Sequence, residues 1–275
     1  MIGVFDSGFG GLSVFRELIR SFPKYDFVYL GDNARYPYGD RSGDAVFRFT
    51  REATAWLFRE GCELVILACN TASAQALRRL QQEWLPGQAA GKKVLGVLVP
   101  VAEAVAQNVR AGERVGIIAT RGTVHSNAYP RELAKHIPAG IEVIQQACPL
   151  FVPLVEEGLL EHPITEAVAY HYLAPLSKRG ITKLILGCTH YPFLFPTIQK
   201  VMGGQCQLFD SGPIVAKALA QYCEKHKALD IKIRKTGLRR YLTTDDPVRF
   251  NEFAQKAAGL FIEAEKLDLV EFDRV

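Results

Sequence analysis

Short apolar runs recur along this chain, and they limit the folds open to it more than any other feature of the sequence. The runs are hydrophobic almost throughout and do not alternate with polar residues, a pattern typical of parallel strands that are covered on both faces. The predicted strands are Ile2–Phe5, Phe27–Leu30, Leu64–Ala68, Val94–Val99, Val115–Ala119, Glu142–Gln145, Lys183–Leu186 and Gln207–Phe209.

Stretches with the periodicity of amphipathic helices lie between the predicted strands. They are Gly11–Ser21, Ser42–Glu60, Ala72–Trp84, Pro100–Ala111, Thr123–His136, Pro149–Glu157, Pro163–Arg179, Phe193–Met202 and Pro213–Lys225. Repeated alternation of strand and helix predicts the α/β class, with one or two doubly wound parallel sheets.

Two internal echoes indicate two similar halves. The segment Phe5–Gly8 returns as Phe209–Gly212, both with the sequence FDSG. The segment Ile66–Thr71 (ILACNT) resembles Ile185–His190 (ILGCTH). In each segment a hydrophobic strand breaks into polar residues ahead of a helix, so together the echoes favour two α/β domains that face each other.

The length of the chain allows this division, because 275 residues are enough for about two domains. We expect the first domain to comprise residues 1–97 and 208–275 and the second to comprise residues 98–207. The last part of the chain would then return to the first domain.

The formal net charge of +4 is spread along the chain. The one dense basic run, Lys232–Arg240, is most simply a solvated loop or helix face. A nucleic-acid patch would interleave aromatic with basic residues over a longer stretch, so we expect no nucleic-acid partner.

The N-terminal segment MIGVFDSG leads straight into a predicted strand and has no features of a secretory signal. No apolar run reaches the roughly 18 residues that a membrane-spanning helix needs. We therefore expect a cytoplasmic protein without a membrane partner.

The sequence contains six cysteines, none of them in a CxxC pair: Cys62, Cys69, Cys148, Cys188, Cys206 and Cys223. Zinc ribbons and thioredoxin-type motifs are therefore not supported, and a cytosolic chain is not expected to form disulfides. Taken singly, each cysteine is most simply a small buried hydrophobic residue.

Polar clusters follow four of the predicted strands, at the sheet edge where open parallel sheets bind their ligands. The clusters are Asp6–Gly11, Asp32–Gly39, Cys69–Ser73 and Cys188–Pro192. The glycines of the first would let the backbone approach an anion, or they simply make a tight turn capped by Asp6 or Ser7. Its spacing is not GxGxxG and it lacks a P-loop lysine, so nucleotide binding is poorly supported. The second suits a loop that closes over a substrate, or is only a loop.

The other two clusters each begin with a cysteine. A thiol at Cys69 would lie near a helix N-terminus, where the dipole lowers its pKa toward the thiolate. Cys188 has the same placement, with an imidazole at His190 two residues on. Taken alone, His190 is more often a hydrogen-bonded structural residue than a catalyst.

The two cysteines gain meaning as a pair, because equivalent places in two halves would let them meet across one crevice. A redox pair would need the sulfurs at bonding distance, and a zinc site from Cys69, Cys188 and His190 lacks an obvious fourth ligand. Two thiols on opposite sides of one substrate carbon would do a third job. One would remove a proton from one face while the other delivers a proton to the opposite face, which inverts the centre.

Five motifs, in order, resemble those of the bacterial glutamate racemases. They are DSGFGGLSVFREL from Asp6, YLGDNARYPYGDRS from Tyr29, ACNTASA from Ala68, CPLFVPLVEEG from Cys148 and GCTHYP from Gly187. The resemblance covers most of the chain from Gly3 to Gly212, whereas the last roughly 60 residues carry no usable motif. It implies two α/β domains related by pseudo-twofold symmetry, with the site between them.

The resemblance also implies residue roles. Cys69 would act on D-glutamate and Cys188 on L-glutamate, without a cofactor. Asp6, His190 and a glutamate, Glu156 in preference to Glu157, would assist them. The residues expected to contact substrate are Asp6, Ser7, Tyr38, Gly39, Asn70, Thr71, Thr189 and His190. The resemblance further implies that the protein supplies D-glutamate for peptidoglycan synthesis and that it forms a homodimer.

Three alternatives stay open at this point. One is a racemase of the same superfamily that acts on aspartate or on another acidic or hydantoin-like substrate. Another is a regulatory protein that binds DNA gyrase. The third, a pyridoxal-phosphate racemase, is disfavoured because no lysine stands at a motif-bearing strand end.

Overall fold

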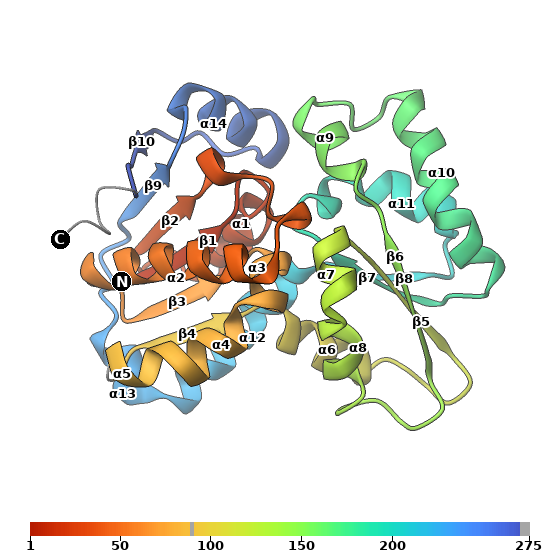
Figure 1. Ribbon diagram of the computed structural model, residues 1–275, viewed down its shortest axis with the longest axis horizontal. Helices are drawn as coiled ribbons and strands as arrows, with labels where there is room; N and C mark the ends of the chain where they lie inside the picture. Colours follow the sequence, from red (N-terminus) through yellow and green to blue (C-terminus); the bar gives the residue numbers. More distant parts are fainter. Residues whose placement is uncertain (89–90, 270–275) are drawn as a thin grey trace.

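The strands form two sheets, and every strand pairing that the structure describes is parallel. The structure is a computed structural model that describes residues 1–88 and 91–269. One sheet lies in each of two lobes that stand side by side (Figure 1). The predicted fold class, α/β with doubly wound parallel sheets, is confirmed.

The first sheet has the strand order β10-β9-β2-β1-β3-β4. Its strands are β1 (Ile2–Asp6), β2 (Phe27–Gly31), β3 (Leu64–Leu67), β4 (Lys93–Gly96), β9 (Arg239–Thr243) and β10 (Ala264–Lys266). The central strand β1 is buried along its whole length. Its Val4 belongs to the core on one face and Phe5 to the core on the other, which is why this strand has no polar alternation.

The second sheet has the order β6-β5-β7-β8. Its strands are β5 (Arg114–Ala119), β6 (Glu142–Ala147), β7 (Lys183–Gly187) and β8 (Gln207–Phe209). The same order, second-first-third-fourth, runs through β2-β1-β3-β4 of the first sheet. The two halves therefore share one topology, and β3 and β7 occupy equivalent positions.

This equivalence supports one of the two echoes and overturns the other. Ile66–Thr71 and Ile185–His190 span the carboxyl ends of the equivalent strands β3 and β7. Phe5–Gly8 spans the end of β1, whereas Phe209–Gly212 spans the end of β8, the counterpart of β4. The shared FDSG sequence reflects a local device instead, because the Asp6 and Asp210 carboxylates each accept the backbone N–H two residues on.

Helices cover the sheets on both faces (Figure 1). They are α1 (Leu12–Ser21), α2 (Gly43–Arg59), α3 (Asn70–Gln75), α4 (Leu77–Arg79), α5 (Leu85–Gln88), α6 (Leu98–Ala106), α7 (Arg121–Ser126), α8 (Ala128–Leu133), α9 (Phe151–Glu156), α10 (Pro163–Lys178), α11 (Phe195–Met202), α12 (Ser211–Lys225), α13 (Lys227–Lys232) and α14 (Pro247–Phe253). Short 3-10 or π turns occupy Asn33–Arg35, Tyr38–Asp40, Leu80–Trp84, Tyr191–Leu194 and Ala254–Ala258.

Two helix boundaries differ from the prediction for identifiable reasons. The predicted strand Val94–Val99 stops at Gly96 and α6 begins at Leu98, because the apolar residues from Val97 onward are those of a buried helix, which a short apolar run does not distinguish from a strand. The predicted helix Thr123–His136 is divided into α7 and α8, because Asn127 adopts the left-handed conformation with φ of 52°.

The predicted helix Ala72–Trp84 is also not continuous. It begins earlier, with α3, and passes through α4 into a π turn at Leu80–Trp84. The early start follows from a cap on α3 by the Cys69 side chain.

The C-terminal region adds β9, β10 and α14, none of which was predicted. Here the interpretation of Lys232–Arg240 as a solvated loop or helix face was wrong at its end, because Arg239 and Arg240 lie in β9. Arg239 donates to the backbone carbonyls of Phe22 and Pro23, and Arg240 pairs with Glu60 at 2.9 Å. These contacts bind the basic residues to the first lobe.

The expected boundary at residues 207 and 208 cuts through β8, since Leu208 and Phe209 pair with Leu184 and Ile185 of the second sheet. The return to the first lobe therefore starts after Phe209, with α12, which packs against α1. Apart from this correction the division into domains 1–97 plus 208–275 and 98–207 stays a prediction. Residues 89–90 and 270–275 of the first of these lie outside the described part of the chain.

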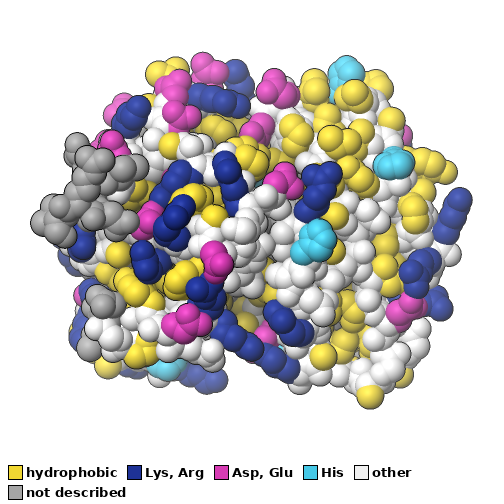
Figure 2. All heavy atoms as spheres, viewed as in Figure 1, with side chains coloured by type: hydrophobic (Ala, Val, Ile, Leu, Met, Phe, Trp, Pro, Cys, Tyr) yellow, Lys and Arg dark blue, Asp and Glu magenta, His cyan; other side chains and the backbone are white. Residues whose placement is uncertain are grey.

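Lys and Arg side chains are scattered among Asp and Glu over the face shown in Figure 2 and do not gather into one patch. None of the helices described is long and apolar enough to cross a membrane. Nor do the described residues contain a group of three or more His, Cys, Asp or Glu that could hold a metal ion.

Candidate active site

A cavity of about 540 Å³ lies between the two sheets. Its lining comes from the segments that follow β1, β2 and β3 of the first sheet and β5, β6 and β7 of the second, together with one residue of α10. The lining residues are Ser7, Tyr36, Pro37, Tyr38, Gly39, Asp40, Cys69, Asn70, Thr71, Thr120, Arg121, Pro149, Leu150, Val152, Pro153, Glu156, Tyr172, Cys188, Thr189 and His190. The carboxyl ends of parallel strands thus converge from both sides on one site.

Cys69 stands where β3 ends, and it caps α3. Its Sγ accepts the backbone N–H of Ala72 at 3.4 Å and lies 3.3 Å from the Ser7 hydroxyl. The side chain is buried but still lines the cavity.

The predicted effect of the helix dipole on the Cys69 thiol was wrong in direction. Burial raises the pKa of Cys69 to about 12, and the Asp6 carboxylate adds to the rise. The hydrogen bonds from Ser7 and from the α3 backbone act in the opposite sense but are outweighed. Cys69 therefore rests as a protonated thiol.

Cys188 occupies the equivalent place after β7, with different neighbours. Its Sγ lies 3.9 Å from His190 Nδ1, and the other ring nitrogen of His190 lies 2.9 Å from Glu156 Oε1. Burial lowers the pKa of His190, but its contacts with Cys188 and Glu156 outweigh burial and raise the pKa to about 10. An imidazolium held by Glu156 therefore faces the Cys188 sulfur.

The two candidate glutamates are separated by position. Glu156 ends α9, lines the cavity and pairs with His190. Glu157 does not belong to this lining; it borders a second hollow, between α9 and α14, which Glu156 also reaches. The geometry therefore favours Glu156 as the auxiliary carboxylate.

Asp6 is fully buried behind the cavity and does not line it. The Thr189 hydroxyl donates to one of its carboxylate oxygens at 3.4 Å, and the Gly8 N–H donates to the other at 3.0 Å. Burial raises the pKa of Asp6 despite the nearby positive charge of His190. Asp6 reaches the reacting groups through its charge and through Thr189.

The glycines that follow Asp6 allow this close assembly. A Cβ at Gly10 would stand 2.4 Å from His190 Nδ1 and from Thr189 Oγ1, and one at Gly11 would stand 2.5 Å from Asp6 Cβ. The sequence offered an anion cradle or a tight turn as the reason for these glycines. The structure gives Gly10 a third role, contact between the two halves, whereas Gly11 allows close packing against Asp6 within the first half.

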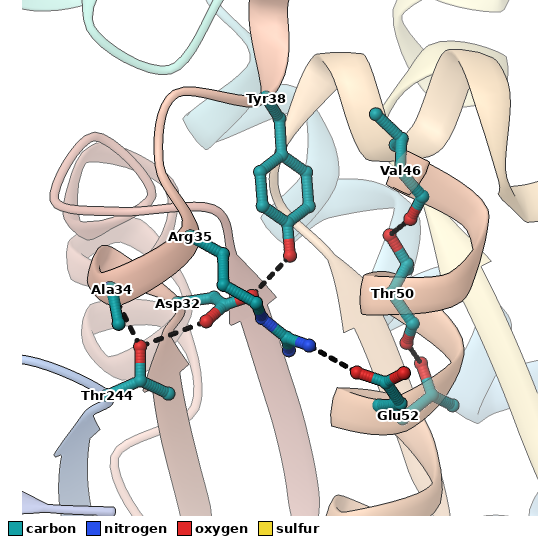
Figure 3. A network of polar contacts seen from close by, with 9 residues as sticks. Asp32, Ala34, Arg35, Tyr38, Val46, Thr50, Glu52 and Thr244 are labelled. Carbon is teal, nitrogen blue, oxygen red and sulfur yellow. Dashed lines mark hydrogen bonds and ion pairs between the residues drawn. The ribbon is translucent and has the colours of Figure 1, made fainter. Parts of the chain in front are cut away.

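Tyr38 and Gly39 line the cavity from the loop after β2. The Tyr38 hydroxyl donates to Asp32, which also accepts from Arg35 at 2.7 Å and from Thr244 at 2.9 Å (Figure 3). The phenol is therefore fixed by the protein. The network also ties the loop to the C-terminal region, because Thr244 follows β9.

Asn70 and Thr71 follow Cys69 at the cavity wall. The Thr71 hydroxyl lies 2.9 Å from that of Thr120 and 3.2 Å from that of Thr123, both from the second lobe. The Asn70 Oδ1 accepts a hydrogen bond from the Tyr129 hydroxyl at 2.6 Å. Neutral polar side chains from both lobes thus meet at this wall of the cavity.

Sequence reasoning missed five polar residues of the lining: Tyr36, Asp40, Thr120, Arg121 and Tyr172. Thr120 and Arg121 follow β5, so the strand-end rule that found the other clusters would have found them. Tyr36 belongs to the cluster Asp32–Gly39, but it was not among the residues expected to contact substrate. The centroid of its ring lies 6.5 Å from that of the His190 ring. Tyr172 lies within α10, where nothing in the local sequence marks it.

Comparisons with known proteins agree with this geometry. A family model described as Asp/Glu/Hydantoin racemase matches residues 2–219. A glutamate racemase from Persephonella marina is 42% identical over 98% of this chain and 97% of its own length.

Solved structures show the same fold. A glutamate racemase isoform from Bacillus anthracis has a TM-score of 0.88 at 35% identity, covering 98% of this chain and 97% of its own. The glutamate racemase from Francisella tularensis, solved in complex with D-glutamate, has a TM-score of 0.87 at 33% identity, with 98% of both chains covered. This chain therefore belongs to the Asp/Glu/hydantoin racemase family and, within it, to the glutamate racemases.

Proposed function

We propose that the protein interconverts L- and D-glutamate without a cofactor, with Cys69 and Cys188 as the two bases. The observation that carries this proposal is the placement of two buried thiols after the equivalent strands β3 and β7. Cys69 lines the cavity from the first lobe, and Cys188 lines it from the second. Convergence of two such groups on one space is what inversion of a single carbon requires.

In the direction that starts from L-glutamate, the Cys188 thiolate takes the α-proton and its S–H bond forms as the C–H bond breaks. The electron pair left on the α-carbon delocalises into the carboxylate, and the Cys69 thiol then delivers its proton to the opposite face. The reverse direction exchanges the roles. Oriented acid–base groups contribute about 10²–10⁴-fold to rate, and donors around the carboxylate stabilise the carbanion-like transition state.

The auxiliary roles follow from the contacts. His190, held by Glu156 at 2.9 Å, supports the negative charge of Cys188. Asp6 acts from behind, through Thr189. Ser7, Gly39, Asn70, Thr71 and Thr189 offer the polar atoms that the two substrate carboxylates and the ammonium group require, while Tyr38 shapes the wall.

The biological setting is part of the same proposal. The product D-glutamate supplies peptidoglycan synthesis in the cytoplasm, and the enzyme works as a homodimer. The family assignment supports this setting.

Racemisation of L-glutamate in deuterated water, with no added cofactor, tests the proposal. Deuterium should enter the α-carbon of D-glutamate, as seen by proton NMR. A parallel incubation with L-aspartate should retain its circular dichroism signal. Loss of the aspartate signal with retention of the glutamate signal would transfer the assignment to an aspartate racemase.

The regulatory alternative is tested in the same preparation. A protein that acts only by binding would leave both amino acids unchanged in the wild type. It would also keep its biological effect when Cys69 or Cys188 is replaced by alanine.

A further inference from the structure

Tyr129 connects the walls that carry the two thiols. It lies in α8 of the second lobe and is fully buried. Its ring packs against the end of β7, since a Cβ at Gly187, the residue before Cys188, would stand 3.2 Å from Tyr129 Cε2. Its hydroxyl reaches the first lobe and donates to Asn70, the residue after Cys69, at 2.6 Å.

This hydrogen bond decides which end of the Asn70 amide is free. Burial raises the pKa of Tyr129, so its hydroxyl keeps the proton and needs an acceptor. Among the described residues the hydroxyl has Asn70 Oδ1 as its hydrogen-bond partner. The opposite amide orientation would leave the hydroxyl proton without an acceptor.

The other end of the amide, Asn70 Nδ2, has no partner among the described residues. Asn70 Nδ2 is shielded from solvent and makes no hydrogen bond with any residue in the described part of the chain. Asn70 is 2% exposed, yet it belongs to the cavity lining. A buried donor in this state is costly unless a ligand meets it, and a carboxylate oxygen is the acceptor that suits it best.

We propose that Tyr129 is a positioning residue that fixes the Asn70 amide with Nδ2 offered to a substrate carboxylate. The inference rests on the proposed function, because the ligand is the amino-acid substrate. Tyr129 touches no substrate itself. It acts through Asn70, and it makes binding depend on correct apposition of the two lobes, since its ring belongs to one and its acceptor to the other.

A double-mutant cycle on glutamate racemisation tests this role. Tyr129→Phe should raise KM for glutamate about tenfold while kcat stays within about threefold, because the donor is lost as a pre-oriented group and the thiols are untouched. Asn70→Ala should raise KM at least as much. In the Asn70→Ala background, Tyr129→Phe should change KM by less than about twofold.

Tyr191→Phe is the matched control. Tyr191 is equally buried, and its hydroxyl donates to the backbone carbonyl of Cys148 at 2.8 Å instead of to a cavity side chain. It should lower the melting temperature as much as Tyr129→Phe does but leave KM unchanged. Additive effects of Tyr129→Phe and Asn70→Ala, or equal changes of KM in both tyrosine variants, would overturn the proposal.

Asn70→Asp keeps the test decisive if Tyr129→Phe does not fold. The aspartate retains the acceptor for Tyr129 and places an anionic oxygen where Nδ2 was, so KM should rise further than in Asn70→Ala. A KM below that of Asn70→Ala would show that the free end is not a donor. A wild-type enzyme inactive on glutamate would refute the proposed function itself, whereas active wild type with an unaffected Tyr129→Phe would refute only this inference.

Discussion

The surroundings of Cys69 and Cys188 differ although their positions in the two halves match. Both thiols follow the third strand of their half and both are 5% exposed. Cys69 has hydroxyl and backbone neighbours, with the Asp6 carboxylate behind it. Cys188 has an imidazole at 3.9 Å, backed by a carboxylate.

The contrast teaches that topology set the positions of the bases while side chains set their charge. With a pKa of about 12, only about 10⁻⁴ of Cys69 is thiolate at pH 8. The positive His190 favours an anion at the other sulfur. The free enzyme therefore rests with Cys69 protonated, whereas the sulfur of Cys188 faces a positive charge.

Removal of either thiol tests whether Cys69 and Cys188, which occupy equivalent positions in the two halves, are both needed for racemisation. It has the largest expected effect on the rate. Cys69→Ala and Cys188→Ala should each lower racemisation by at least about 10³-fold, because one of the two proton transfers loses its group. Circular dichroism of both enantiomers measures the loss. Cys62→Ala, another buried cysteine but outside the cavity lining, is the control and should remain active.

Alkylation tests the charge difference directly. Iodoacetamide at pH 8 should modify Cys69 more slowly than Cys188, because the thiolate is the nucleophile and burial raises the pKa of Cys69 to about 12. Peptide mass spectrometry over time distinguishes the two sites. Faster labelling of Cys69 would reverse the asymmetry drawn from its surroundings.

Substitutions of Glu156 and Glu157 test whether the carboxylate behind His190 assists Cys188. Glu156→Gln should lower kcat/KM about tenfold and slow alkylation of Cys188, because the imidazolium loses its counter-charge. Glu157→Gln removes the same charge one residue away, outside the lining of the cavity, and should leave both quantities unchanged. Equal effects of the two variants would contradict a specific role for Glu156.

The pH dependence of stability tests the charge on the Cys188 side without any measurement of activity. The folded pKa of His190, about 10, exceeds its ordinary value of 6.5, so its contribution is complete below pH 6.5 and is lost as pH rises through 10. The free energy of unfolding should therefore fall over this range, by at most about 1.4 kcal/mol per pH unit. Urea unfolding at several pH values measures the slope of the free energy of unfolding against pH. This slope should be flatter in His190→Asn than in the wild type. An unchanged slope would exclude His190 as its source.

Sequence alone determined the parallel sheets and the places of both cysteines. A strand covered on two faces must be apolar throughout, so β1, β3 and β7 were visible without a structure. The carboxyl ends of such strands share one edge, which also made the polar clusters behind them interpretable.

Tertiary structure decided what local patterns do not encode. β9 carries two arginines and is only partly covered, so it lacked an apolar run. The Cys69 pKa depended on burial outweighing a hydrogen-bonded helix cap, a balance that spacing cannot give. Tyr129 stands 59 residues from Asn70 in sequence, and only the packing of the two lobes makes them partners. Periodicity reports which side chains are buried, whereas charge and orientation depend on which distant groups burial brings together.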